Sequence, residues 1–208
     1  MKLLIAIPCM DTVPVFFMKS LIDLTKKLTE DGVDYTVAIE SGTLVYMARD
    51  RLAGRAVNQG YTHVLWLDSD MVFEPELLED LQFCGKDFVT GIAHGRRKPF
   101  VSCLFKNIDL NHLELWKLED YPTEAFEVAG CGMACCLMST EIIKQIMINN
   151  GTAFNPIPQY GEDISFCKRA RDLGFHIYAE PTVRLGHVAH IPIYPDDTPR
   201  YQDEYQKS

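Results

Sequence analysis

The first half of the chain alternates between short apolar runs and longer amphipathic segments. The apolar runs predict strands buried in a sheet and cover residues 2–7, 35–39, 62–67 and 87–92. The amphipathic segments have the spacing of helices and cover residues 16–28, 44–58 and 75–83. This order of strands and helices predicts a doubly wound α/β fold, an α/β/α sandwich around a mixed but mostly parallel sheet.

The second half is less regular. Strands are expected at residues 101–105, 113–118, 132–138 and 175–179, and helices at 140–147 (capped by Ser139) and 164–173. From Pro192 onward the chain is polar and rich in proline. We therefore expect a single domain over residues 1–208, in which residues 192–208 form a flexible C-terminal arm.

The charge balance narrows the choice of partners. The 208 residues include 20 Lys and Arg against 29 Asp and Glu, a net charge of −9. Such an acidic chain is not expected to bind nucleic acid or an anionic membrane surface. We also expect no transmembrane segment, and Pro8 interrupts the N-terminal apolar run too early for a signal peptide. The seven cysteines contain no CxxC pair, which predicts a reduced, cytoplasmic protein.

Ligands of doubly wound sheets bind at the carboxyl ends of the strands, so the chemistry is expected just after Ile7, Ile39, Leu67 and Ile92. The strongest feature there is the sequence Asp68-Ser69-Asp70, which follows a buried strand directly. Two carboxylates that converge at a strand end repel each other unless a cation lies between them, and hard oxygen ligands suit Mg²⁺ or Mn²⁺. The alternative is an ordinary turn with Asp as a capping residue.

Further candidates come from acidic, imidazole and basic groups. Glu162 and Asp163 open a helix after an irregular loop, where a carboxylate can serve as a general base or merely as a cap. His187, preceded by Gly186, could complete a metal site, with His190 as its competitor. Arg49 could pair with phosphate, although a solvated helix face is an equal alternative.

The remaining motifs are less specific. Gly130 and Gly132 permit close approach of the backbone to a ligand or to a packed helix. The basic cluster at residues 95–98 could meet an anionic substrate or be a plain exposed loop. The chain has neither a GxGxxG arrangement nor a Walker motif, which disfavours nicotinamide and P-loop chemistry.

Taken together, these segments resemble the GT-A glycosyltransferases, in particular the compact, family-2-like members carried by bacteria and phages. The matching segments, in the family's order, are residues 7–8, 48–50, 67–70 (as the DxD motif), 130–132 and 161–163, with the late His187. The resemblance implies a GT-A fold and transfer of a sugar from a nucleotide-sugar donor, which we expect to be a UDP-sugar, to an acceptor hydroxyl on a glycan, protein or small molecule.

The resemblance also implies roles for individual residues. The metal, Mn²⁺ or Mg²⁺, would be held by Asp70 and His187, with Asp68 on the donor ribose or on a metal-bound water. The donor would further contact Pro8, Cys9, Asp11, Glu40, Arg49, Ser69, Gly130 and Gly132. Asp163 would be the catalytic base of an inverting enzyme, with Glu162 beside it.

Three alternatives stay open. A late histidine ligand also occurs in retaining GT-A enzymes. The same pocket could belong to a non-catalytic nucleotide-sugar binding module, in which Asp163 only caps its helix. A nucleotidyltransferase has a similar sheet, but it usually carries a glycine-rich basic signature where this chain has residues 8–11.

Overall fold

The computed structural model describes residues 1–97 and 99–189, so the predicted arm at 192–208 and His190 lie outside the described residues. The first half contains β1 (Lys2–Pro8), α1 (Val15–Glu30), β2 (Asp34–Glu40), α2 (Val45–Asn58), β3 (His63–Leu67), β4 (Met71–Phe73), α3 (Leu77–Phe83) and β5 (Phe88–Gly91). The second half contains β6 (Leu104–Asp109), β7 (His112–Leu115), a 3-10 turn (Leu118–Asp120), β8 (Phe126–Val128), β9 (Gly130–Cys131), β10 (Cys135–Ser139), α4 (Thr140–Asn150), α5 (Glu162–Asp172), β11 (Ile177–Glu180) and β12 (Leu185–His187).

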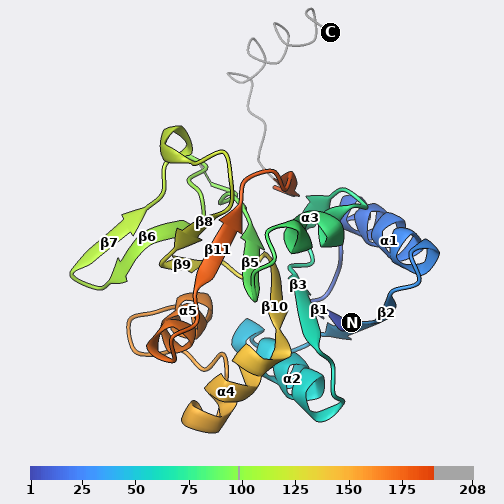
Figure 1. The fold of residues 1–208 in the computed structure, drawn as a ribbon, viewed down its shortest axis with the longest axis horizontal. Helices are drawn as coiled ribbons and strands as arrows, with labels where there is room; N and C mark the ends of the chain where they lie inside the picture. The colour runs from blue at the N-terminus through green and yellow to red at the C-terminus, as the bar shows by residue number, and fades with distance from the viewer. Residues whose placement is uncertain (98, 190–208) are drawn as a thin grey trace, which may run out of the picture.

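A seven-stranded sheet in the order β2-β1-β3-β10-β5-β11-β8 forms the centre of the molecule (Figure 1). β1 pairs in parallel with β2 and β3, and β5 pairs in parallel with β11. β10 runs antiparallel to both β3 and β5, and β8 runs antiparallel to β11. The strands β2, β1, β3, β5 and β11 therefore share one direction, which confirms the predicted α/β class with a mixed, mostly parallel sheet.

Helices cover both faces of this sheet. α1 and α3 pack on one face, where Leu24 and Leu78 join one buried cluster, and α2, α4 and α5 pack on the other, with Phe166 in the second cluster. Adjacent residues of a strand point to opposite faces. Accordingly, Cys135 belongs to the first cluster and Cys136 to the second.

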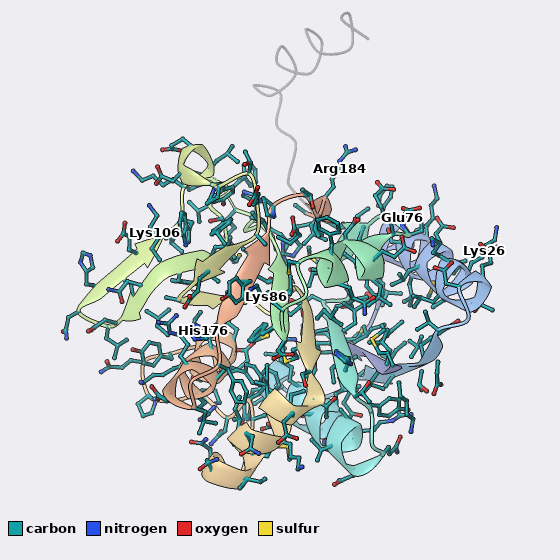
Figure 2. The ribbon with its side chains drawn as sticks, in the orientation of Figure 1. Lys26, Glu76, Lys86, Lys106, His176 and Arg184 are labelled. Carbon is teal, nitrogen blue, oxygen red and sulfur yellow. The ribbon has the colours of Figure 1, made fainter. Side chains whose placement is uncertain are left out.

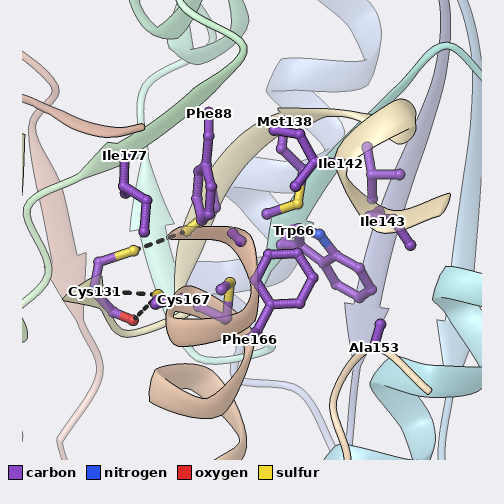
Figure 3. Packing of buried hydrophobic residues seen from close by; sticks show 14 of the residues in the cluster. Trp66, Phe88, Cys131, Met138, Ile142, Ile143, Ala153, Phe166, Cys167 and Ile177 are labelled. Atoms are coloured by element: carbon purple, nitrogen blue, oxygen red, sulfur yellow. Dashed lines mark hydrogen bonds between the residues drawn. The ribbon is translucent and has the colours of Figure 1, made fainter. Parts of the chain in front are cut away.

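Aromatic rings connect β3 to the chain segment before α5. The Trp66 ring lies edge-on to Phe154 at 5.0 Å between centroids, and Phe154 stacks on Phe166 at 4.6 Å. Figure 3 shows Trp66 and Phe166 within this cluster. Such pairs contribute about 0.5–1.5 kcal/mol each beyond their burial. They hold residues 153–154 against the strand that ends just before Asp68.

Several sequence-based boundaries were wrong. Strands expected at 101–105 and 113–118 are instead β6 and β7, which form an antiparallel hairpin that also pairs with β9. The short strands β4, β8 and β9 were missed, because two or three residues carry no readable period. α5 begins at Glu162, two residues before the expected start at 164, so Asp163 lies in the first turn of the helix that it was expected to open.

Charged side chains project from the outside of the molecule. Lys26, Glu76 and Arg184 extend away from the ribbon (Figure 2). Among the helices of residues 1–97 and 99–189, none combines the length and the apolar character needed to cross a membrane.

Candidate functional site

A cleft of about 930 Å³ opens at the carboxyl ends of the sheet strands. Its lining comes from four connections: residues 8–15 after β1, residues 43–45 after β2, residues 68–70 after β3, and Arg96 after β5. His187 and Val188 at the end of β12 complete it. These are the strand ends at which a ligand site was expected, and the volume is in the range of small-molecule and cofactor sites.

The DxD sequence forms a tight turn at the end of β3. The amide of Asp68 donates to the carbonyl of Ala134 at 2.9 Å, and the amide of Met71 donates back to the Asp68 carbonyl at 3.2 Å. Asp68, Ser69 and Asp70 all line the cleft. The two carboxylates have different partners, because Asp68 pairs with Arg49 and Asp70 pairs with Arg96 and His187.

Strand pairing brings His187 to Asp70 across more than a hundred residues of sequence. β12 runs antiparallel to β4 with His187 opposite Met71, and the amide of Val188 donates to the Asp70 carbonyl at 2.9 Å. His187 Nε2 consequently lies 3.2 Å from Asp70 Oδ1. Arg96 Nη1 lies 2.7 Å from the other oxygen of Asp70, Oδ2.

The hydrogen bonds of His187 fix the orientation of its ring. Its Nδ1 lies 2.8 Å from the carbonyl oxygen of His94, and a carbonyl can only accept, so Nδ1 carries a proton. Nε2 faces Asp70 and donates to this carboxylate when the ring is protonated; in the neutral ring its lone pair could bind a metal ion instead. The hydrogen bond to Asp70 raises the pKa of His187. Burial acts to raise the pKa of Asp70, but the hydrogen bond from His187 and the charges of His187 and Arg96 bring it below its ordinary value.

The donor set at this point suits a divalent ion. Two ligands at right angles around an octahedral ion, each at about 2.1 Å, lie about 3 Å apart, close to the separation of Asp70 Oδ1 and His187 Nε2. Within residues 1–97 and 99–189, no three side chains of His, Cys, Asp and Glu gather as a metal-binding group. Asp70 and His187 are the pair that could contact such an ion, and a Mg²⁺ or Mn²⁺ ion commonly completes its coordination with substrate phosphates and water.

Arg49 is buried below the cleft and joins two acidic segments. Its Nη2 donates to Asp68 Oδ1 at 2.7 Å, and its Nε lies 3.8 Å from Glu162 Oε1. The guanidinium also lies 5.9 Å from the ring centres of Trp66 and Phe154. With 2% of its surface exposed, Arg49 acts within the protein, and it does not line the cleft.

Asp163, Glu162 and Gly132 do not line the cleft. A Cβ placed on Gly161 would be 2.9 Å from Asp163 Oδ1, so glycine at position 161 leaves room for this carboxylate, whereas a Cβ on Gly132 would crowd the Cβ of Cys103 at 3.2 Å. Asp163 Oδ1 accepts a hydrogen bond from the Ile164 amide at 2.7 Å. Burial, followed by the charge of Glu162, raises the pKa of Asp163. A raised pKa makes this carboxylate a stronger base than an ordinary one.

The structure does not bring every predicted residue to the cleft. Pro8, Cys9 and Asp11 line it. Glu40 lies outside the lining, with its carboxylate 2.7 Å from Arg51 and its carbonyl bonded to the Cys9 amide. Gly130 is buried, and a Cβ there would approach Ile108 to 3.0 Å and Ile164 to 3.4 Å, so this glycine serves the packing of the β6–β7 hairpin on α5.

Two parts of the site received no role from the sequence. The sequence indicates Arg96 only as a member of the basic cluster at residues 95–98, which could meet an anionic substrate or be a plain exposed loop. The second part is the apolar wall of the cleft, formed by Val13, Val15, Leu44 and Val45 at the starts of α1 and α2. Exposed apolar residues at helix starts carry no periodic signal, because periodicity reports only the face that packs on the core.

The fold is shared with proteins of known structure, whereas comparisons by sequence find no relative. No protein-family model matches the chain, and no curated protein matches it. Among the solved structures that match, the crystal structure of A197 from STIV has a TM-score of 0.59 at 19% sequence identity. The alignment covers 91% of this chain and 87% of that chain. The chain therefore shares its α/β architecture with A197 along most of its length.

Proposed function

We propose that this protein is a metal-dependent glycosyltransferase of the GT-A type that moves a sugar from a nucleotide-sugar donor to an acceptor hydroxyl. The observation that carries the proposal is the 3.2 Å approach of His187 Nε2 to Asp70 Oδ1 in the cleft. A carboxylate and an imidazole from distant segments converge where a doubly wound sheet binds its ligands. The expected donor is a UDP-sugar.

Different residues of the cleft would bind different parts of the donor. Asp70 and His187 would hold Mn²⁺ or Mg²⁺, and the nitrogen ligand favours Mn²⁺. When bound, the ion supplies stabilisation of the negative charge that develops on the departing nucleoside diphosphate. Pro8, Cys9 and Asp11 would contact the nucleobase.

Asp163 is the proposed base of an inverting transfer. An acceptor hydroxyl has a pKa far above 7, so a positioned carboxylate must take its proton during the attack on the sugar. Burial makes Asp163 the better proton acceptor, and Gly161 leaves room for its carboxylate. Because Asp163 acts in its ionised form, we expect transfer to slow as the pH falls through its raised pKa.

A thermal-shift panel tests donor binding. UDP-, GDP-, CDP- and dTDP-sugars are each added with Mn²⁺ or with a chelator, and one nucleotide class is expected to stabilise the protein only with Mn²⁺. A ligand at a hundredfold excess over its Kd contributes about 2.7 kcal/mol. No stabilisation by any donor in Mn²⁺ would contradict the proposal.

The Asp163→Asn variant tests turnover. Release of nucleoside diphosphate in the presence of acceptor should fall by about 10²–10⁴, the usual contribution of a general base, while donor binding persists. Asp172→Asn at the other end of α5 is the matched control, because Asp172 is exposed and lies beyond the site. Turnover within a few-fold of wild type would leave Asp163 as a helix cap.

The products distinguish the remaining functions. A binding module would be stabilised by a donor without any turnover, and Asp163→Asn would then change nothing measurable. A nucleotidyltransferase would release pyrophosphate from a nucleoside triphosphate. The anomeric configuration of the product, read by NMR, separates the inverting from the retaining outcome.

A further inference from the structure

Arg96 forms an ion pair with Asp70, the carboxylate that would hold the proposed metal ion. Its Nη1 donates to Asp70 Oδ2 at 2.7 Å, and His187 Nε2 lies 3.2 Å from Asp70 Oδ1. Both oxygens of Asp70 therefore have partners, and one partner carries a permanent positive charge. A divalent ion at Asp70 would have to compete with this guanidinium.

The Arg96 guanidinium is the main group in the cleft that can bind an anion. Among the described residues that line the cleft, Asp11, Asp68 and Asp70 are acidic, and Arg96 is the one permanent cation. Arg49 is buried and held by Asp68 and Glu162. The cleft would therefore repel a ligand with phosphate groups, unless a bound metal ion and Arg96 both contacted those phosphates.

The position of Arg96 permits it to change partners. Its loop is closed at the base by the Gly95 amide, which donates to the Val101 carbonyl at 2.9 Å, and by a bridge between His94 and Ser102. The Arg96 side chain is 53% exposed, in contrast to the buried Arg49. Its guanidinium can therefore reorient by rotation about its own side-chain bonds.

We infer that Arg96 is a counter-ion that exchanges partners. It pairs with Asp70 when no ligand is bound, and it moves to the phosphates of a bound diphosphate when a divalent ion binds Asp70. The planar guanidinium can donate two parallel N–H groups to phosphate oxygens. The inference deepens the proposed function and rests on it for the nucleoside part of the ligand. The exchange itself requires only a metal ion and a diphosphate, and it makes their binding cooperative.

Titration calorimetry on the full chain tests the exchange with two probes, Mn²⁺ alone and pyrophosphate in the presence of Mn²⁺. Arg96→Met keeps the apolar stem and removes the charge. We expect this variant to bind Mn²⁺ alone about fivefold or more tightly than wild type, since its competitor is gone. It should bind pyrophosphate in Mn²⁺ about tenfold more weakly, the scale of a lost hydrogen bond to a charged group.

The opposite signs of the two shifts separate exchange from damage. A variant with a distorted site would lose affinity for both probes, and Arg97→Met, on the same loop, should match wild type for both. Shifts in one direction, no shift in either, or no binding of Mn²⁺-pyrophosphate by wild type would each overturn the inference.

The experiments distinguish failure of the proposed transferase function from failure of the Arg96 exchange. A protein that shows the opposite shifts with Mn²⁺ and pyrophosphate but turns over no nucleotide sugar keeps the exchange and is not a transferase. A protein that turns over a nucleotide sugar while Arg96→Met behaves as wild type with both probes remains a transferase, and the exchange is then wrong.

Discussion

The Arg49 guanidinium donates a 2.7 Å hydrogen bond to Asp68, and through its Nε it also lies 3.8 Å from Glu162. One buried cation thus joins the turn after β3 to the first turn of α5. The rings of Trp66 and Phe154 flank it at 5.9 Å. Arg49 therefore fixes the position of the turn after β3, which lines the cleft, relative to the first turn of α5, which carries Asp163.

Replacing Arg49 by Met should therefore destabilise the protein strongly. The change leaves Asp68, Glu162 and Asp163 as neighbouring acids without their buried cation, and loss of one partner of such a pair costs about 3–5 kcal/mol when both partners are buried. Because the Asp68 side chain is 30% exposed, we expect about 3 kcal/mol in urea unfolding.

Arg51→Met is the matched control, two positions along the same helix. Arg51 pairs with Glu40 at 2.7 Å but is 55% exposed, and pairs of this kind contribute about 0–1 kcal/mol. Equal losses for the two variants would show that the Arg49 pair is no more than a surface contact.

Asp163→Asn should stabilise the folded protein at neutral pH. Burial and the neighbouring Glu162 raise the pKa of Asp163 above its ordinary value of 3.8. A carboxyl whose pKa is higher when folded favours folding while it is protonated, and this contribution is lost as the pH rises through the folded pKa. The wild type should therefore unfold at lower temperature than the variant at pH 7.

The difference should shrink as the pH falls below the raised pKa, because wild-type Asp163 then becomes neutral. Thermal unfolding between pH 3 and 8 measures this directly, with Asp172→Asn as the exposed control. A variant less stable than wild type at pH 7 would mean that Asp163 contributes more as a cap for the Ile164 amide than its buried charge costs.

Asp50 holds the segment that leads to the acids of α5. Its Oδ1 accepts from the amides of Ala153 at 2.9 Å and Phe154 at 2.8 Å, and both of those residues are buried. Asp50→Ala leaves two buried donors without partners, at about 1–3 kcal/mol each. We expect faster hydrogen exchange at these two amides, by mass spectrometry or NMR, while Asp50→Asn retains most of the protection. Unchanged exchange in Asp50→Ala would show that other contacts hold the segment.

The cysteines should differ widely in reactivity. Cys131 Sγ lies 4.0 Å from Cys136 Sγ. The Cys167 thiol donates to the Cys131 carbonyl at 3.5 Å (Figure 3). The hydrogen bonds with Cys136 and Cys167, together with burial, raise the pKa of Cys131, which suppresses the reactive thiolate. We expect iodoacetamide to label Cys9, which lines the cleft, first and Cys131 only after denaturation, as read by peptide mass spectrometry. Labelling of Cys131 at the rate of Cys9 would contradict the packing.

The sheet and the DxD turn could be predicted because their signals are local. The runs in β1, β3 and β10 are five to seven residues long, enough for burial on both faces to show in the composition. The meeting of His187 and Asp70 depends on β12 pairing with β4, two strands of three residues each, and no local pattern specifies such a partner. The sequence indicated both residues as candidate metal ligands, but only the structure shows that they lie within 3.2 Å of each other.

The interpretation of Arg49 shows a second limit. Arginine on a helix near the strand ends suits a phosphate, and nothing in its neighbours along the chain distinguishes that role from a buried pair. The rings of Trp66 and Phe154, brought together by the packing of the segment before α5 on β3, decide the matter. Local sequence patterns do not show when a residue such as Arg49 is buried by segments that lie far away in the sequence.

A crystal structure of the protein grown with UDP and Mn²⁺, with anomalous data collected at the manganese edge, tests the central claim most directly. We predict one anomalous peak within coordination distance of an Asp70 oxygen and His187 Nε2, with the diphosphate on the same ion and the uracil against residues 8–15. UDP bound elsewhere, or bound in the cleft with no manganese at Asp70, would contradict the account.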